Sequence, residues 1–219
     1  MIERPGSARP PEQKPPPDHS STAEQLARVR SGDPSGFAKL YGRTAPALHG
    51  WAALRIHPEL RARLDPDDLV QEVWWRAMDS FGTYDPAKGS FRTWLFRIAT
   101  NVLLDAFRRL RSKRPDDDAA GLKAARRTRP EALIAEGTSI CLQVSRNETI
   151  SRMIAAVSAM DADDRALFVH CALEGLTVGE ASPLIGLGEA AGAKRWQRLK
   201  ARLRESPDWR AFLVDLGDA

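Results

Sequence analysis

Residues 84–114, YDPAKGSFRTWLFRIATNVLLDAFRRLRSKR, constrain the fold more than any other part of the chain. A turn containing Pro and Gly leads into a run of apolar residues at helical spacing, which predicts a long helix beginning near Phe91. At about 100° per residue this helix has two distinct faces. The side that we expect to be buried holds Leu95, Ile98, Val102, Ala106 and Leu110, and the opposite, basic side holds Arg97, Asn101, Leu104, Arg108 and Arg111.

The basic side of this helix has the residue types that bind DNA. Guanidinium groups such as that of Arg108 neutralise phosphates, and the amide of Asn101 can pair with adenine through two hydrogen bonds. Trp94 falls near this side, and its indole can stack on an unpaired base. The alternative for this helix alone is an ordinary amphipathic helix with a solvated basic side and a half-buried tryptophan.

A second helix is indicated by DPDDLVQEVWWRAM, residues 65–78. Asp65 can cap its N-terminus, and Pro66 suits the first helical position. Apolar residues line one side, whereas polar ones lie elsewhere and form a surface able to meet a protein partner. The polar residues of interest are Asp68, Gln71, Glu72 and Arg76. The pattern alone is more typical of a solvated acidic surface.

Residues 173–204 have the outline of a helix-turn-helix. Thr177 and Glu180 are spaced as a capping box, Gly186 suits the turn, and a last helix is expected from Glu189. Pro183 lies inside the first of the two helices, where it predicts a kink or an early end. The last helix carries a basic side that suits a DNA major groove, made of Lys194, Arg195, Arg198 and Arg202. A basic packing helix is the alternative.

The spacing of apolar residues along the whole chain predicts an all-α protein of two small helical domains joined by a flexible linker. We expect a disordered Pro-rich tail at 1–20, a first domain at 21–114, the linker at 115–146, a second domain at 147–205 and a C-terminal tail at 206–219. The net charge is only +4, but basic residues are clustered, which favours a local anionic partner such as nucleic acid.

Other classes of protein find little support in the sequence. Cys141 and Cys171 are far apart and lack metal-ligand spacing, so we expect neither a disulfide scaffold nor a metal site. No catalytic or cofactor motif is complete, so we expect no cofactor and no enzymatic activity. No apolar run is long enough to span a bilayer and no secretory signal is visible, so we expect a cytoplasmic protein without membrane insertion.

Taken together, these segments resemble the sigma-70 family, in particular the compact extracytoplasmic-function (ECF) sigma factors, which retain sigma regions 2 and 4. The resemblance is strongest over DPDDLVQEVWWRA and YDPAKGSFRTWLFRIATNVLLDAFRR, which are similar to region 2. It implies an RNA polymerase subunit that directs promoter recognition, melting of the −10 element and transcription initiation. The expected partners are core RNA polymerase and promoter DNA, with an anti-sigma factor as a further candidate.

The resemblance also implies roles for individual residues. It implies that Asp68, Gln71 and Glu72 dock on the clamp helices of the largest polymerase subunit. The −10 element is expected to meet Trp94, Arg97, Asn101, Asp105, Arg108, Arg109 and Arg111, and the −35 element to meet Lys194, Arg195, Arg198 and Arg202. Gly192 departs from the family, which usually has a branched apolar residue there, so we expect a missing core contact.

Two other functions stay open on the sequence. A stand-alone helix-turn-helix regulator would bind duplex DNA without polymerase, but would not need the polar surface around Asp68. A degenerate sigma relative would act mainly by binding another protein, and Pro183 and Gly192 in the second domain favour it.

Overall fold

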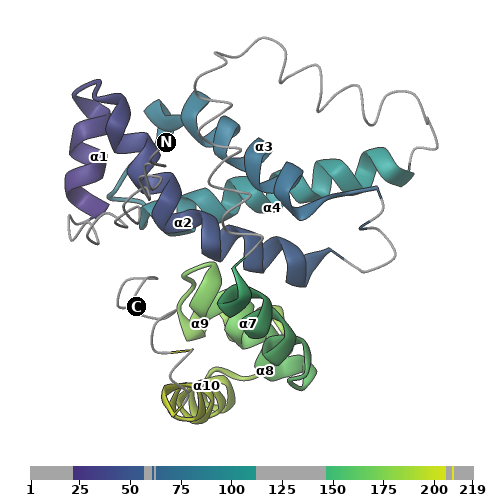
Figure 1. The fold of residues 1–219 in the computed structure, drawn as a ribbon. Coiled ribbons are helices and arrows are strands. Elements are labelled where there is room, and N and C mark those ends of the chain that lie inside the picture. The colour runs from purple at the N-terminus through teal and green to yellow at the C-terminus, as the bar shows by residue number, and fades with distance from the viewer. Residues whose placement is uncertain (1–21, 57–60, 62, 112–146, 206–208, 210–219) are drawn as a thin grey trace, which may run out of the picture.

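The computed structural model describes residues 22–56, 61, 63–111, 147–205 and 209, and all regular structure among them is helical (Figure 1). This confirms the predicted all-α class. The helices are α1 (Thr22–Arg30), α2 (Pro34–Arg55), α3 (Pro66–Asp79), the 3-10 turn η2 (Phe81–Thr83), α4 (Phe91–Arg111), α7 (Glu148–Ser158), α8 (Ala162–Leu167), the π-helix η3 (Phe168–Leu173), α9 (Val178–Leu184) and α10 (Glu189–Arg204). None of these described helices is long and apolar enough to cross a membrane. The predicted linker 115–146 lies outside the described residues.

The starts of these helices follow from local side-chain chemistry. The Asp65 carboxylate accepts a hydrogen bond from the Asp67 backbone N–H at 2.8 Å, and Pro66 occupies the first position of α3, as predicted. Thr177 and Glu180 form the predicted capping box at α9. Each of these caps satisfies backbone N–H groups that a helix N-terminus leaves without partners.

Helices α1 to α4 form the N-terminal unit. Helix α2 packs against α1 and α3, and α3 packs against α4. Its core contains Trp51 of α2, Val73 of α3 and Leu95 of α4, none of which is exposed to solvent. The apolar residues that the helical period assigned to the inner sides of α3 and α4 therefore meet in one core.

Helices α7 to α10 form the C-terminal unit, in which α9 and α10 make the helix-turn-helix. Gly186 in the turn has φ +75°, a left-handed conformation that favours glycine. Helix α9 ends at Leu184, one residue after Pro183, so the predicted early end is confirmed.

The structure contradicts the expectation that a core contact is missing at Gly192. It is buried, and a Cβ atom added there would overlap Ser182 Oγ of α9 and lie 3.0 Å from Ser182 Cβ. The absence of a side chain at Gly192 thus permits a close approach of α9 and α10. No core contact is missing at this position.

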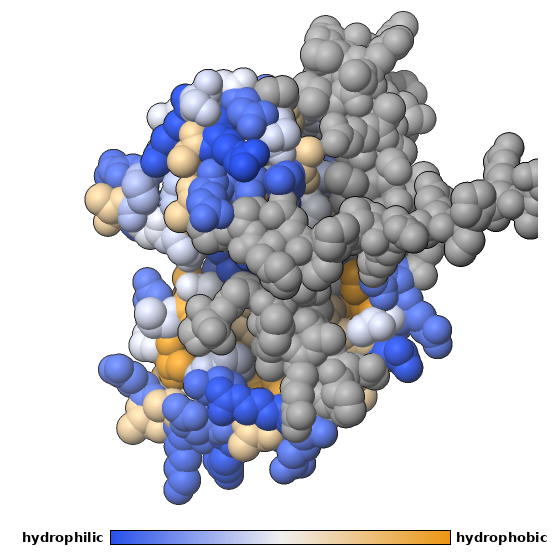
Figure 2. Space-filling model, turned by 60° about the vertical axis from the view of Figure 1, so that its left-hand side comes forward, coloured by the Kyte–Doolittle hydropathy of each residue, from blue (hydrophilic) through white to orange (hydrophobic). Residues whose placement is uncertain are grey.

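The two units pack against each other. Helix α2 contacts α7 and η3, and the buried apolar residues of both units form one continuous cluster. In Figure 1 the C-terminal unit lies beneath α2. On the face drawn in Figure 2 the described surface is mostly hydrophilic, with hydrophobic residues showing between the charged ones. Because the two units share one buried apolar cluster, the described helices form a single packed body.

Candidate nucleic-acid interface

The basic side of α4 faces solvent. Arg97, Asn101 and Arg108 are exposed, and Leu104 among them is 43% exposed. On the opposite side Leu95, Val102 and Ala106 are buried, whereas Ile98 and Leu110 are half-buried. The exposure that helical spacing predicted is confirmed for Arg97, Asn101, Leu104 and Arg108, whereas Ile98 and Leu110, expected to be buried, keep part of their surface exposed.

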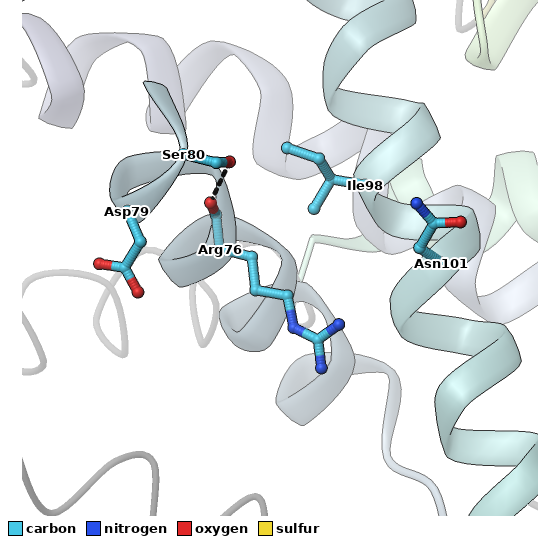
Figure 3. A pocket seen from close by; sticks show the side chains of 5 residues that line it. All are labelled: Arg76, Asp79, Ser80, Ile98 and Asn101. Carbon is cyan, nitrogen blue, oxygen red and sulfur yellow. Dashed lines mark hydrogen bonds between the residues drawn. The ribbon is translucent and has the colours of Figure 1, made fainter. Parts of the chain in front are cut away.

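A hollow of about 360 Å³ lies between α3 and α4 (Figure 3). Arg76, Asp79 and Ser80 line it from the end of α3, and Ile98 and Asn101 line it from α4. A guanidinium, a carboxylate, a hydroxyl and an amide thus surround an apolar side chain. Arg76 and Ser80 already hydrogen-bond within the protein, to Glu72 and Asp105 and to the Arg76 carbonyl. The exposed Asn101 amide offers a donor and an acceptor beside the apolar Ile98 side chain, as recognition of a flat polar ring requires.

A chain of ion pairs fixes the wall of this hollow. Arg76 Nε donates to Glu72 Oε1 at 2.9 Å, and Arg76 Nη1 donates to Asp105 Oδ2 at 2.9 Å. The other Asp105 oxygen accepts from Arg108 Nη1 at 2.8 Å. The hydrogen bond from Arg76 holds the pKa of the Asp105 carboxyl below its ordinary value. Asp105, predicted to meet the −10 element, is therefore already paired with two arginines.

Glu72 departs from the prediction. It is only 8% exposed, so the expectation that it belongs to an exposed polar surface is wrong. Its carboxylate lies four residues before Arg76 on the same helix, a spacing at which helical side chains meet. Asp68 is exposed and Gln71 is half-buried, so these two remain on the surface of α3.

Trp94 is half-buried in a cluster of aromatic rings. Its ring centroid lies 5.5 Å from those of Tyr84 and Phe91, and 6.3 Å from that of Phe81. These residues come from η2, the following turn and the first turn of α4. Trp94 is thus held in place by its neighbours, and part of its surface remains available for stacking.

On α10, Lys194 and Arg198 are exposed, as the major-groove prediction requires. Arg195 has carboxylate partners instead: its Nε donates to Asp164 at 2.6 Å, and its Nη atoms pair with Asp161 and Asp163. The hydrogen bond to Asp164 raises the pKa of Arg195. Arg202 donates to the other Asp164 oxygen at 2.8 Å. Arg195 and Arg202 therefore tie α10 to α8.

Two further residues of the predicted site lie at the end of α4. Arg109 is half-buried, and the side chain of Arg111 lies outside the described part of the chain. The predictions for both residues remain untested.

Sequence reasoning grouped Arg76 with the polar surface of α3 but did not predict its ion pairs, although its spacing from Glu72 is typical of a helical ion pair. No sequence pattern indicated that Arg195 would pair with Asp161, Asp163 and Asp164, because these aspartates lie at the start of another helix, α8. Their contact depends on how α8 and α10 pack.

Comparisons with known proteins agree with the sequence and the fold. Residues 40–113 match the family described as sigma-70 region 2. The chain is 30% identical over 188 residues to the RNA polymerase sigma factor CnrH of Cupriavidus metallidurans, covering 81% of this chain and 89% of that protein. It is 27% identical over 185 residues to the ECF RNA polymerase sigma factor SigM of Mycobacterium tuberculosis, covering 84% and 83%.

A solved structure of CnrH in complex with the cytosolic domain of CnrY is 23% identical and covers 90% of this chain and 97% of that one, with a TM-score of 0.39. The family assignment rests on the sequence matches, which extend over both helical units. The chain belongs to the sigma-70 family of RNA polymerase sigma factors, as a member of the ECF type that acts in transcription initiation.

Proposed function

We propose that this sigma factor binds core RNA polymerase through the exposed part of α3, captures an unpaired base of the −10 element on α4, and binds the −35 duplex through α10. The hollow beside Asn101 is the observation that carries the proposal. Its volume, about 360 Å³, lies within the range of small-ligand sites, and the donor and acceptor of the Asn101 amide suit the polar edge of a base.

The exposed arginines of α4 support the capture of single-stranded DNA next to this hollow. Arg97 and Arg108 can follow the phosphates of the non-template strand, while Asn101 contacts a base. The aromatic cluster holds Trp94 near the start of the same helix, where the indole can stack on a base that has left the duplex. Binding energy of this kind drives strand opening without ATP.

For the polymerase contact, Asp68 and Gln71 are the residues that α3 presents to a partner. Glu72 contributes from below the surface, because its carboxylate orients Arg76. The protein would act in the cytoplasm with polymerase, and an anti-sigma factor remains a candidate partner.

For the −35 contact, Lys194 and Arg198 are the basic side chains of α10 best exposed to meet phosphates and base edges. Arg195 and Arg202 support this contact by holding α10 against α8, since Asp164 bridges both guanidinium groups. A loss of either arginine would thus disturb the position of the recognition helix before it removed a DNA contact.

Run-off transcription with sigma-free core polymerase on genomic fragments tests the proposal. New discrete start sites are expected, and Asn101→Ala should weaken them at least tenfold, while Thr100→Ala on the adjacent, half-buried position serves as the control. Silence despite core binding would favour the degenerate sigma relative. Silence without core binding would favour a separate helix-turn-helix regulator and contradict the proposal.

A further inference from the structure

The outer side of α10 lies opposite to the side on which this helix packs. Gly192, Leu199 and Leu203 are buried and mark the inner side. At about 100° per residue, the exposed residues within about 40° of the opposite line are Ala190, Lys194, Gln197 and Ala201. In Figure 1, α10 lies on the side of the C-terminal unit away from α2. Among the described residues, these four therefore form the centre of the surface that α10 presents to a partner.

Two arginines at one edge of this outer side already have carboxylate partners on α8. Arg195 Nε donates to Asp164 at 2.6 Å, and Arg202 Nη2 donates to the other Asp164 oxygen at 2.8 Å. Arginine recognises guanine by directing two of its donors at O6 and N7. A guanidinium that donates to a carboxylate has fewer donors left for such a contact. Reading of bases by α10 therefore depends on other side chains.

Gln197 stands in the middle of the outer side between two small neighbours. Residues four positions apart lie next to each other on a helix surface, so Ala193 and Ala201 border Gln197 along the helix. Both alanines are exposed, and each presents only a methyl group. The longer side chain of Gln197 therefore extends past its two neighbours toward whatever the helix meets.

Lysines lie three positions before and after Gln197. Lys194 is exposed, whereas Lys200 is half-buried and its Nζ lies 5.7 Å from the centre of the Trp196 ring. This is a cation–π distance, which keeps the Lys200 charge on the flank of the helix. Such charges attract phosphates whatever the base sequence. Gln197 is thus the residue at the centre of the outer side that offers both a donor and an acceptor.

We propose that Gln197 reads an adenine of the −35 duplex and that Ala193 and Ala201 contact thymine methyl groups beside it. The Gln197 amide N–H donates to adenine N7, while its carbonyl accepts from adenine N6, a pairing that suits the major groove. Alanine methyl groups suit the C5-methyl of thymine. The helix therefore prefers A·T pairs at the positions that these three residues face. This inference rests on the proposed function, because it takes α10 as the reader of the −35 element.

Selection of −35 sequences by the holoenzyme tests Gln197. Core polymerase carrying wild-type protein, Gln197→Ala or Gln197→Glu is offered promoters with a randomised −35 region. The wild type should select adenine at one position by about 5- to 150-fold, the range for a two-bond contact to a base edge. Gln197→Ala should lose this preference at that position alone, and Gln197→Glu should prefer cytosine, whose N4 donates to a carboxylate. Ser151→Ala, at an exposed position of α7, should select as the wild type does.

Base analogues distinguish direct contact from recognition of DNA shape. Replacing the selected adenine with 7-deazaadenine removes the N7 acceptor and keeps the pairing with thymine. Binding of the wild-type holoenzyme should fall several-fold, whereas Gln197→Ala should bind both duplexes equally. Replacing neighbouring thymines with uracil removes the methyl groups that face Ala193 and Ala201. This should weaken binding by up to about fourfold per methyl group, for the wild type and for Gln197→Ala alike.

Three results would overturn the role of Gln197: an adenine preference that Gln197→Ala retains, a uniform loss of affinity for all sequences in that variant, or equal binding of adenine and 7-deazaadenine by the wild type. Unchanged affinity for the uracil duplex would remove the alanines from the contact. Run-off transcription reports the sigma function separately. If the wild-type holoenzyme starts transcription and one of these results is found, the inference fails alone. If it starts none, the proposed function fails as well.

Discussion

Gly192 is the residue whose role the structure changes most. Any side chain there meets Ser182, whose hydroxyl donates to the Val178 carbonyl at 2.7 Å. Gly192→Ala should therefore destabilise the protein by about 1–3 kcal/mol, as overpacking of a close contact does. Urea unfolding measures this change. Combining Gly192→Ala with Ser182→Gly should restore most of the lost free energy of unfolding. If it does not, the destabilisation does not arise from the contact with Ser182.

Trp94 lies at the boundary between core and surface. Comparing two substitutions separates its role in packing from its role in stacking on DNA. Trp94→Ala removes both the ring cluster contact and any stacking on DNA, whereas Trp94→Phe keeps an aromatic ring beside Tyr84 and Phe91. We expect Trp94→Ala to reduce open-complex formation by roughly tenfold, since base stacking contributes about 1–3 kcal/mol, with little effect on closed-complex binding. Permanganate footprinting and filter binding measure the two steps. Equal losses in both would indicate a structural tryptophan.

Predictions of the exposure of single residues succeeded where that exposure depends on the position of the residue in one helix. The exposure of Asn101 and Arg97 follows from the period of α4 alone. The pairing of Arg76 with Asp105 and of Arg195 with Asp164 depends on side chains of other helices, and periodicity contains no information on these. The expectation of a missing core contact at Gly192 was wrong for the same reason, because Ser182, which fills the space, lies on α9.

At the scale of elements, α10 is attached to α8 by Asp164, a buried carboxylate that accepts from both Arg195 and Arg202. Asp164→Asn should lower the free energy of unfolding by about 2 kcal/mol, because two hydrogen bonds to a charged group are weakened. Asp163→Asn, on the same helix but more exposed, should have a much smaller effect. Thermal unfolding compares the two variants. Equal effects would show that Asp164 has no special role in positioning α10.

The basic side of α4 leads to a prediction about salt. Arg97→Ala combined with Arg108→Ala should weaken binding of the holoenzyme to a melted promoter and flatten its dependence on salt. Each lost phosphate contact should reduce the slope of log K against log salt by about 0.7 on single-stranded DNA. Lys88→Ala, in the exposed turn before α4, is a control for the loss of one positive charge outside the basic side, and is compared with each single arginine variant. An unchanged slope in the double variant would remove both arginines from the interface.

For the whole molecule, the all-α class and the starts of α3, α4, α9 and α10 could be predicted because caps, prolines and periodicity are local signals. The packing of the two units on each other could not. It depends on Glu174, Trp51 and Arg92, which are far apart in the sequence and match no spacing rule. Glu174 in particular follows an apolar run and has the sequence context of an ordinary exposed helix end.

The depressed pKa of Glu174 makes the packing of the two units on each other depend on pH, because this buried carboxylate of the C-terminal unit accepts hydrogen bonds from α2. The carboxyl has a pKa of about 2 in the packed structure against an ordinary 4.5, so its stabilising contribution is complete above pH 4.5 and is lost as pH falls toward 2. Groups that face this carboxylate are His170 on η3 and Trp51 and Arg55 on α2. Because His170 belongs to the same unit as Glu174, its contact does not hold the units together, and the contribution to their packing is at most roughly 3 kcal/mol.

The radius of gyration should therefore rise as the pH is lowered from 5 toward 3, before far-UV circular dichroism reports loss of helix. Glu174→Gln lacks the titrating carboxyl, so its radius of gyration should already be larger at neutral pH and should show no step in this window. Scattering at half-unit pH intervals, with circular dichroism on the same samples, makes the comparison. An identical acid expansion in wild type and variant would assign the transition to other carboxyls, and Glu174 would then have no part in holding the two units together.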